Sequence, residues 1–135
     1  MSRGLDTVRR VWKAAEEGDY EAAAACIGPG YVWIDHGLGV VARSPKEIAA
    51  AFADFKPWSN VRYEIEEAFE SIEGVVVVRA VKSGNLTGSW RSMEATGQHV
   101  SYQFCDIFKF DSDARIVYEE AYYDMASIRK QLGYE

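Results

Sequence analysis

An aspartate stands among aromatic and aliphatic residues in the segment Val100–Phe110, where it is well placed for acid–base chemistry. Side chains alternate between the two faces of a strand, so the even-numbered residues share one face, which reads Val, Tyr, Phe, Asp, Phe, Phe. Ionising Asp106 among such neighbours is costly, so we expect this carboxyl to be protonated more readily than in water, or to be matched by a donor. A neutral acid can donate a hydrogen bond to an enolate oxygen, and a carboxylate in an apolar cleft is a stronger base towards carbon acids. The alternative is that Asp106 has a purely structural role, with its carboxyl hydrogen-bonded by backbone amides or paired with an arginine such as Arg79.

A second pair of polar residues, Asp35 and His36, ends the aromatic segment 31–35. Asp35 has the parity of Tyr31 and Trp33, so its side chain is expected to face the same way as those rings. His36 can titrate near neutral pH, and a glycine-containing loop follows it, as is common at catalytic sites. The alternative is an aspartate that initiates a turn beside a solvated histidine.

Aromatic residues make up 13% of the sequence and are concentrated in segments that alternate like strands. Such a surface is either core or the wall of a concave apolar site. Glu119 and Glu120 must face opposite sides of their strand, and we assign Glu120, together with Tyr122, to the pocket. The expected substrate-binding residues are Trp12, Tyr31, Trp33, Phe52, Phe55, Trp58, Trp90, Tyr102, Phe104, Phe108, Glu120 and Tyr122.

The elements that position these residues can be read from hydrophobic periodicity. Helical spacing predicts a helix over residues 5–15, Asp19 can cap a short helix over 22–26 before the break at 28–30, and Ser44 with Glu47 forms a capping box that opens a third helix. Strand-like alternation marks residues 31–35, 61–66, 75–82, 89–93, 99–110 and 115–123, and Asp124 can cap a short terminal helix.

This order of elements predicts an α+β fold, with one domain over residues 1–135. We expect helices on one face of a strongly curved, mixed or antiparallel sheet around a central pocket. The other face of the sheet also needs cover, which a second copy would supply, so we expect a homodimer through the outer sheet face.

Charge and composition argue against several classes of partner. The net charge of −6 leaves no basic stripe for nucleic acid, and an acidic membrane surface is excluded for the same reason. No apolar run approaches the ~20 residues of a membrane-spanning helix, and the first residues lack the apolar stretch of a signal peptide, so we expect a cytoplasmic protein.

The sequence contains no pattern typical of a metal site or a bound cofactor. Two histidines are few and far apart, and no glycine-rich phosphate loop or nucleophile elbow is present, so any chemistry is expected to be cofactor-free. Cys26 and Cys105 are expected to be buried reduced thiols, with a disulfide as the alternative.

Several segments in order resemble the nuclear-transport-factor-like superfamily of cone-shaped α+β folds, in particular its SnoaL-like polyketide cyclase and ketosteroid isomerase branches. The segments that carry the resemblance are 15–20 (AEEGDY), 33–36 (WIDH), 95–100 (ATGQHV), 105–111 (CDIFKFD), 122–124 (YYD) and 131–133 (QLG). The resemblance implies that Asp35 is the isomerase base that moves a proton between carbons, and that Asp106 is the acid that stabilises the dienolate oxygen. Asp106 also resembles the acid–base aspartate of the cyclases, which deprotonates a carbon acid for aldol closure.

The sequence departs from two branches of this superfamily. The first helix has Val11 and Trp12 where the isomerases have a tyrosine of the oxyanion site, and Phe104 and Ala121 stand where the epoxide hydrolases have an arginine and an aspartate. We therefore expect a cofactor-independent enzyme that acts through an enolate on a hydrophobic polyketide- or steroid-like molecule, with Asp106 as the principal acid–base group and Asp35 and His36 assisting. The alternatives are a non-catalytic binder of an apolar small molecule and a pure dimerisation module.

Overall fold

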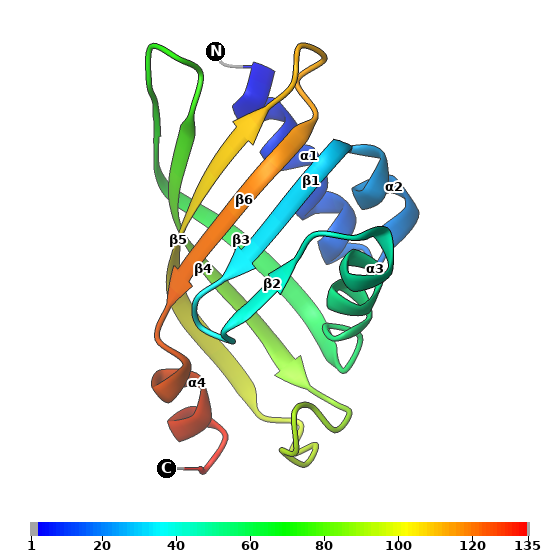
Figure 1. The fold of residues 1–135 in the computed structure, drawn as a ribbon. Coiled ribbons are helices and arrows are strands. Elements are labelled where there is room, and N and C mark those ends of the chain that lie inside the picture. The colour runs from blue at the N-terminus through cyan, green and yellow to red at the C-terminus, as the bar shows by residue number, and fades with distance from the viewer. Residues whose placement is uncertain (1–2, 135) are drawn as a thin grey trace.

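The computed structural model describes residues 3–134, which form four helices and a six-stranded sheet (Figure 1). The helices are α1 (Arg3–Glu16), α2 (Tyr20–Ala25), α3 (Pro45–Ala53) and α4 (Met125–Gln131). The strands are β1 (Ile27–Asp35), β2 (Val40–Ala42), β3 (Trp58–Glu70), β4 (Val76–Leu86), β5 (His99–Phe110) and β6 (Ile116–Tyr123).

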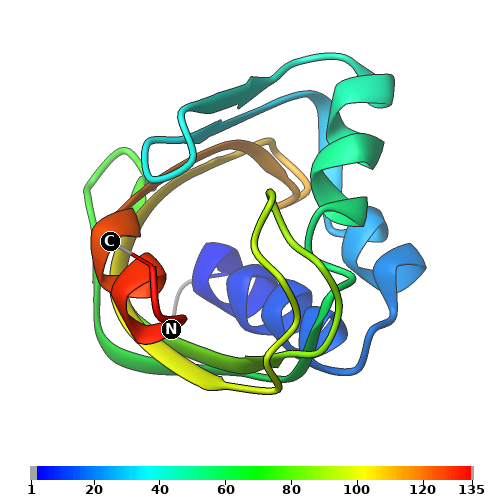
Figure 2. The ribbon, with the colours of Figure 1, turned by 90° about the horizontal axis from the view of Figure 1, so that it is seen from below.

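The sheet curls strongly but does not close, with strand order β2-β1-β6-β5-β4-β3 (Figure 2). Neighbouring strands are antiparallel except β1 and β6, which run parallel, so the sheet is mixed. Helix α1 lies within the curve of the sheet, and α2 and α3 lie beside the β1–β2 end (Figures 1 and 2). The α+β class and the curved mixed sheet therefore agree with the sequence-based expectation.

Three helices begin at the capping residues that the sequence indicates. Ser44 accepts a hydrogen bond from the backbone N–H of Glu47, and the Glu47 carboxylate accepts one from the N–H of Ser44, which completes the capping box of α3. Asp19 and Asp124 cap α2 and α4 by accepting from backbone N–H groups three and two residues later. Local sequence thus fixes where these helices start.

Helix α1 supplies one side of the main core. Val8 and Trp12 are buried against Val78 and Phe108 of the sheet, and each such side chain contributes roughly 1.5–3 kcal/mol on burial. A second apolar cluster joins α4 to the ends of β4 and β5, and its buried members are Leu86, Trp90, Met93, Val100, Ile128 and Leu132. The sheet is thereby packed at both ends, and a hollow remains between them.

The structure corrects several local expectations. Residues 28–30 continue β1 instead of breaking the chain, the short strand β2 was not expected, and residues 89–93 form only an isolated bridge between Trp90 and Met93. Cys26 and Cys105 are free thiols, but both are partly exposed instead of buried, because Cys26 follows the end of α2 and Cys105 lies on the outer face of β5. None of the helices in residues 3–134 is long and apolar enough to cross a membrane.

Candidate active site

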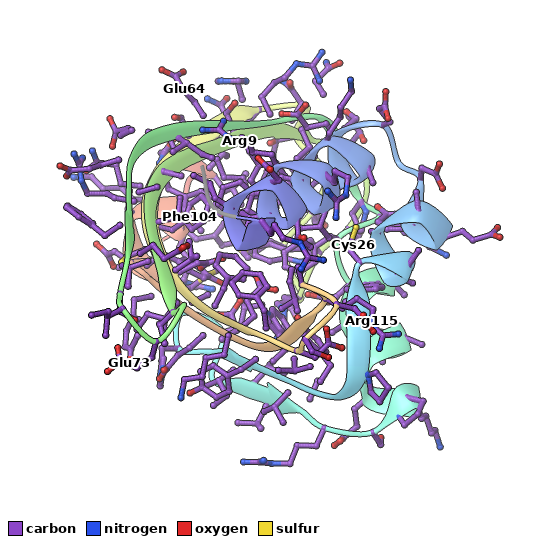
Figure 3. The ribbon with its side chains drawn as sticks, turned by 90° about the horizontal axis from the view of Figure 1, so that it is seen from above. Arg9, Cys26, Glu64, Glu73, Phe104 and Arg115 are labelled. Carbon is purple, nitrogen blue, oxygen red and sulfur yellow. The ribbon has the colours of Figure 1, made fainter. Side chains whose placement is uncertain are left out.

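A cavity of about 140 Å³ lies between the concave face of the sheet and helices α1 to α3. Half of its lining residues are aromatic. Phe104 points into the curve of the sheet, while Glu64 points away from it (Figure 3). Eight of the expected substrate-binding residues line it: Trp12, Tyr31, Trp33, Phe52, Phe55, Trp58, Tyr102 and Phe104. The rings pack edge to face and face to face; for example, the Trp12 and Tyr63 rings stack with centroids 4.9 Å apart.

Asp106 contributes a carboxyl to this cavity from the middle of β5. The residue is 3% exposed, and no N–H or O–H group of the described residues donates a hydrogen bond to its buried Oδ1 atom. The side chain instead meets a second carboxyl, that of Glu119 on β6. Two carboxyl groups can hydrogen-bond only if one of them carries a proton, so this pair holds a proton.

Ionisation is opposed more strongly at Asp106 than at Glu119. Burial, followed by the negative charge of Glu119 and the hydrogen bond with it, raises the pKa of Asp106 well above its ordinary value. Burial also raises the pKa of Glu119, but hydrogen bonds from Asp106 and from the Tyr31 hydroxyl, 2.9 Å from Oε1, favour its ionised form. The arrangement favours a neutral Asp106 beside an ionised Glu119 inside an apolar cavity.

Asp35 forms the second acidic group of the cavity, at the end of β1. It is 2% exposed, and its oxygens accept hydrogen bonds from the backbone N–H of Leu38 at 2.8 Å and from the Tyr123 hydroxyl at 2.9 Å. Burial raises the pKa of Asp35, and these hydrogen bonds partly offset that effect. Asp35 therefore both initiates the turn after β1, as the structural alternative supposed, and faces the cavity.

The sheet register relates the two aspartates. Asp35 on β1 pairs with Ala121 on β6, and Ala121 pairs with Asp106 on β5. Since adjacent strands lie about 4.8 Å apart, the two backbones are separated by roughly 10 Å. The small Ala121 side chain lines the cavity with both aspartates. A keto group and its neighbouring carbon would fit between an acid on one side and a base on the other.

Arg79 does not pair with Asp106, so a structural ion pair between these two residues is excluded. Its guanidinium lies on the outer face of β4 and forms ion pairs with Glu66 at 2.9 Å and Glu67 at 3.3 Å.

His36, Glu120 and Tyr122 lie outside the cavity, so their assignment to the site is corrected. His36 is exposed, its Nε2 lies 2.7 Å from Oε2 of Glu120, and its ring stacks on Tyr122 with centroids 4.3 Å apart. Tyr122 is 44% exposed and also donates a hydrogen bond to Glu120. Hydrogen bonds, from His36 first, lower the pKa of Glu120 to about 2. These three side chains form a polar cluster on the outer face of the sheet.

Two aromatic residues expected at the site also belong elsewhere. Phe108 is completely buried in the core, where its ring lies 6.0 Å from that of Trp12. Trp90 is buried in the second apolar cluster, where its indole N–H donates to Asp54, and it lines only a small adjoining cavity of about 20 Å³.

A bulge in β6 explains why Glu119, and not Glu120, faces the cavity. Phe110 pairs with Ile116 but Lys109 pairs with Tyr118, so one extra residue, Val117, is inserted in β6. The insertion reverses the alternation that begins at the buried Ile116 and turns Glu119 inward. The expected inward positions in β6 were therefore wrong after Val117. The turn sequence 111–115 carries no signal that predicts the bulge.

Lys82 is a further charged residue of the cavity that was not predicted from the sequence. It lies on β4 between Tyr63 and Tyr102, and its ammonium group lies 4.2 Å from the centroid of the Phe55 ring. Its position on the inward face follows from its even parity with Val78 and Ala80.

Comparisons with solved structures agree with this architecture. A proposed SnoaL-like polyketide cyclase from Jannaschia sp. CCS1 aligns with a TM-score of 0.82 at 19% identity, covering 96% of this chain and 91% of that one. IdmH, a proposed polyketide cyclase from Streptomyces antibioticus, aligns with a TM-score of 0.79 at 19% identity and covers 96% and 98%. A protein with a ketosteroid isomerase-like fold from Catenulispora acidiphila aligns with a TM-score of 0.79 at 18% identity and covers 96% and 93%.

These identities establish a shared fold, of the nuclear-transport-factor-like and ketosteroid isomerase-like kind. A search of curated protein sequences finds no match. A family model, that of the SnoaL-like domain, matches residues 8–119, which span the cavity wall from α1 to Glu119. The chain therefore belongs to the SnoaL-like family.

Proposed function

We propose that the protein is a cofactor-independent acid–base enzyme that acts through an enolate on a hydrophobic, ring-containing small molecule of the polyketide or steroid type. The observation that carries this proposal is the Asp106 carboxyl, buried beside Glu119 at the wall of a cavity that Asp35 also lines. The family and its polyketide cyclase-like structural neighbours support the reaction class.

Enolisation needs an acid at the carbonyl oxygen and a base at the neighbouring carbon. In the proposed step the carboxylate of Asp35 takes the carbon-bound proton, the electrons of the C–H bond form the enol double bond, and the carbonyl oxygen accepts the proton of Asp106. The Tyr123 hydroxyl and the Leu38 N–H hold Asp35 in place, and Glu119 holds Asp106. Return of a proton at another carbon gives isomerisation, and attack of the enol carbon on a second carbonyl gives ring closure.

The cavity volume bounds the buried part of the substrate. A cavity of about 150 Å³ in another protein accepts benzene, so the 140 Å³ seen here suits about one ring. Any larger substrate would extend beyond the aromatic wall.

Hydrogen–deuterium exchange tests enolisation without knowledge of the natural substrate. The protein is incubated in deuterated buffer with 2-tetralone, a bicyclic ketone with acidic protons next to its carbonyl, and their loss is followed by NMR. The wild type is expected to accelerate exchange over buffer, and Asp106→Asn, with its fold verified by circular dichroism, to lose roughly 10²-fold or more of that acceleration. His36→Gln, on the outer face, is the matched control and should exchange at the wild-type rate.

The second candidate is a non-catalytic binder of apolar molecules, which the aromatic and aliphatic residues that line most of the cavity support. Binding of 2-tetralone without any acceleration of exchange would favour this candidate. Equal exchange by the wild type and Asp106→Asn would refute the role of Asp106.

A further inference from the structure

We propose that Lys82 binds an acidic oxygen of the substrate, so that the substrate is an apolar ring compound that also carries a carboxylate or a similarly acidic enol or phenol. This inference rests on the proposed function, since it describes the substrate of the same cavity. The ammonium group of Lys82 lies among aromatic rings.

Lys82 is held on the inside of the sheet by its place in the middle of β4. Its backbone pairs with Tyr63 of β3 on one side and with Tyr102 of β5 on the other. Both neighbouring rings line the cavity, so the lysine side chain extends into a space walled by aromatic groups.

The contacts of the ammonium group are with ring faces. Nζ lies 4.2 Å from the centroid of Phe55 and 5.1 Å from that of Tyr63. Within residues 3–134, no carboxylate lies within 4.0 Å of it in an ion pair. Ring faces attract a cation, but they do not accept the three strong hydrogen bonds that an ammonium group can donate.

Lys82 influences the three acids of the cavity without pairing with any of them. Lys82 acts through its charge on Asp35, Asp106 and Glu119, yet it forms no direct pair with any of them. If its role were to neutralise these acids, contact with one of them would be expected, because an isolated charge in an apolar cavity is costly. The ammonium group is instead left free to meet a bound molecule.

The register separates Lys82 from the reactive acid by a distance that suits a ring. Lys82 stands opposite Tyr102, and Asp106 lies four residues further along β5, which corresponds to about 13 Å of strand. A molecule whose carbonyl meets Asp106 can therefore place one or two rings against the aromatic wall and direct an acidic oxygen at Lys82.

A pair of probes of equal shape and different charge tests the assignment. The probes are 2-naphthoate, an anion at neutral pH, and 2-naphthamide, its neutral counterpart, and their dissociation constants are measured by isothermal titration calorimetry. The wild type is expected to prefer the naphthoate by about tenfold or more, as a hydrogen bond to a charged group would give. Lys82→Met should lose this preference while its affinity for the amide stays within twofold, and Lys82→Arg should retain it.

Lys109→Met is the matched control, since Lys109 also lies over a ring, that of Tyr118 at 4.7 Å, but on the outer face of the sheet. It should behave as the wild type. The proposal is overturned if neither probe binds, if the wild type shows no preference for the anion, or if Lys82→Met keeps that preference. These outcomes are separate from the exchange test, because Asp106→Asn should lose exchange activity yet still discriminate between the probes.

Discussion

The chemistry proposed here depends on how two carboxyl groups share one proton in an apolar cavity. The proposed step needs a protonated Asp106, and burial and the adjacent Glu119 both oppose its ionisation. Glu119 remains the acceptor because the Tyr31 hydroxyl stabilises its charge. Removing the charge of Glu119 should therefore change the proton affinity of Asp106 without removing Asp106 itself.

Glu119→Gln is expected to lower the pKa of Asp106, since the amide keeps the shape of the side chain but not its charge. The proposed step needs Asp106 in its protonated form, so activity falls as the pH rises through the pKa of this group. The alkaline limb of the pH profile for 2-tetralone exchange should therefore move to lower pH in the variant. Glu120→Gln, the neighbour on the outer face, should leave the profile unchanged. An alkaline limb that stays in place in Glu119→Gln would show that the pair does not control the acid.

At the scale of elements, much of the site could be predicted from periodicity. The period-2 pattern of β5 places Asp106 inside, and the parity of β1 does the same for Asp35, because regular strands alternate strictly. The Val117 bulge breaks that alternation in β6, so Glu119 replaced Glu120 at the site. The contact of Asp106 with Glu119 depends on pairing between strands, which no single segment of the sequence encodes.

In the turn between β1 and β2, Gly37 lies close against the ring of Tyr123, and Tyr123 holds Asp35 in place. A Cβ atom on Gly37 would collide with the Tyr123 ring, whose hydroxyl donates to Asp35. Gly37→Ala is therefore expected to destabilise the fold by about 1–3 kcal/mol, as overpacking typically does. Urea denaturation measures this free energy of unfolding.

A double-mutant cycle distinguishes this clash from a general effect of alanine on the turn. In the Tyr123→Leu background the smaller side chain leaves room for a Cβ atom. Adding Gly37→Ala should therefore lower the free energy of unfolding clearly less than it does in the wild type. An equal loss of unfolding free energy in both backgrounds would mean that the ring of Tyr123 does not require a glycine at this position.

On the scale of the whole molecule, we propose that two copies pair through the outer face of the sheet. One row of paired positions crosses all six strands there: Val41, Ile34, Glu120, Ile107, Val77 and Phe69. Five of these six side chains are apolar, and Val41 and Phe69 are 46% and 57% exposed. An apolar row of this length facing water favours association, and a closed pair buries the same face of both copies.

Light scattering coupled to size-exclusion chromatography is expected to give twice the chain mass for the wild type. Ile107→Lys should shift the protein to a monomer, because it places a charge at the centre of the row on each copy. Lys130→Ala on α4, which lies at one end of the sheet (Figure 1), is the control and should remain a dimer. A wild-type monomer at micromolar concentration would contradict the pairing.

The protonation state of Asp106 is the central claim, and carboxyl ¹³C NMR measures it most directly. The protein is labelled at aspartate carboxyl carbons, titrated with pH, and the Asp106 signal is assigned by its loss in Asp106→Asn. The expected result is a carboxyl that ionises well above about 3.9, the ordinary value for aspartate. An Asp106 signal that titrates at that ordinary value would contradict the proposed acid and, with it, the enolisation step.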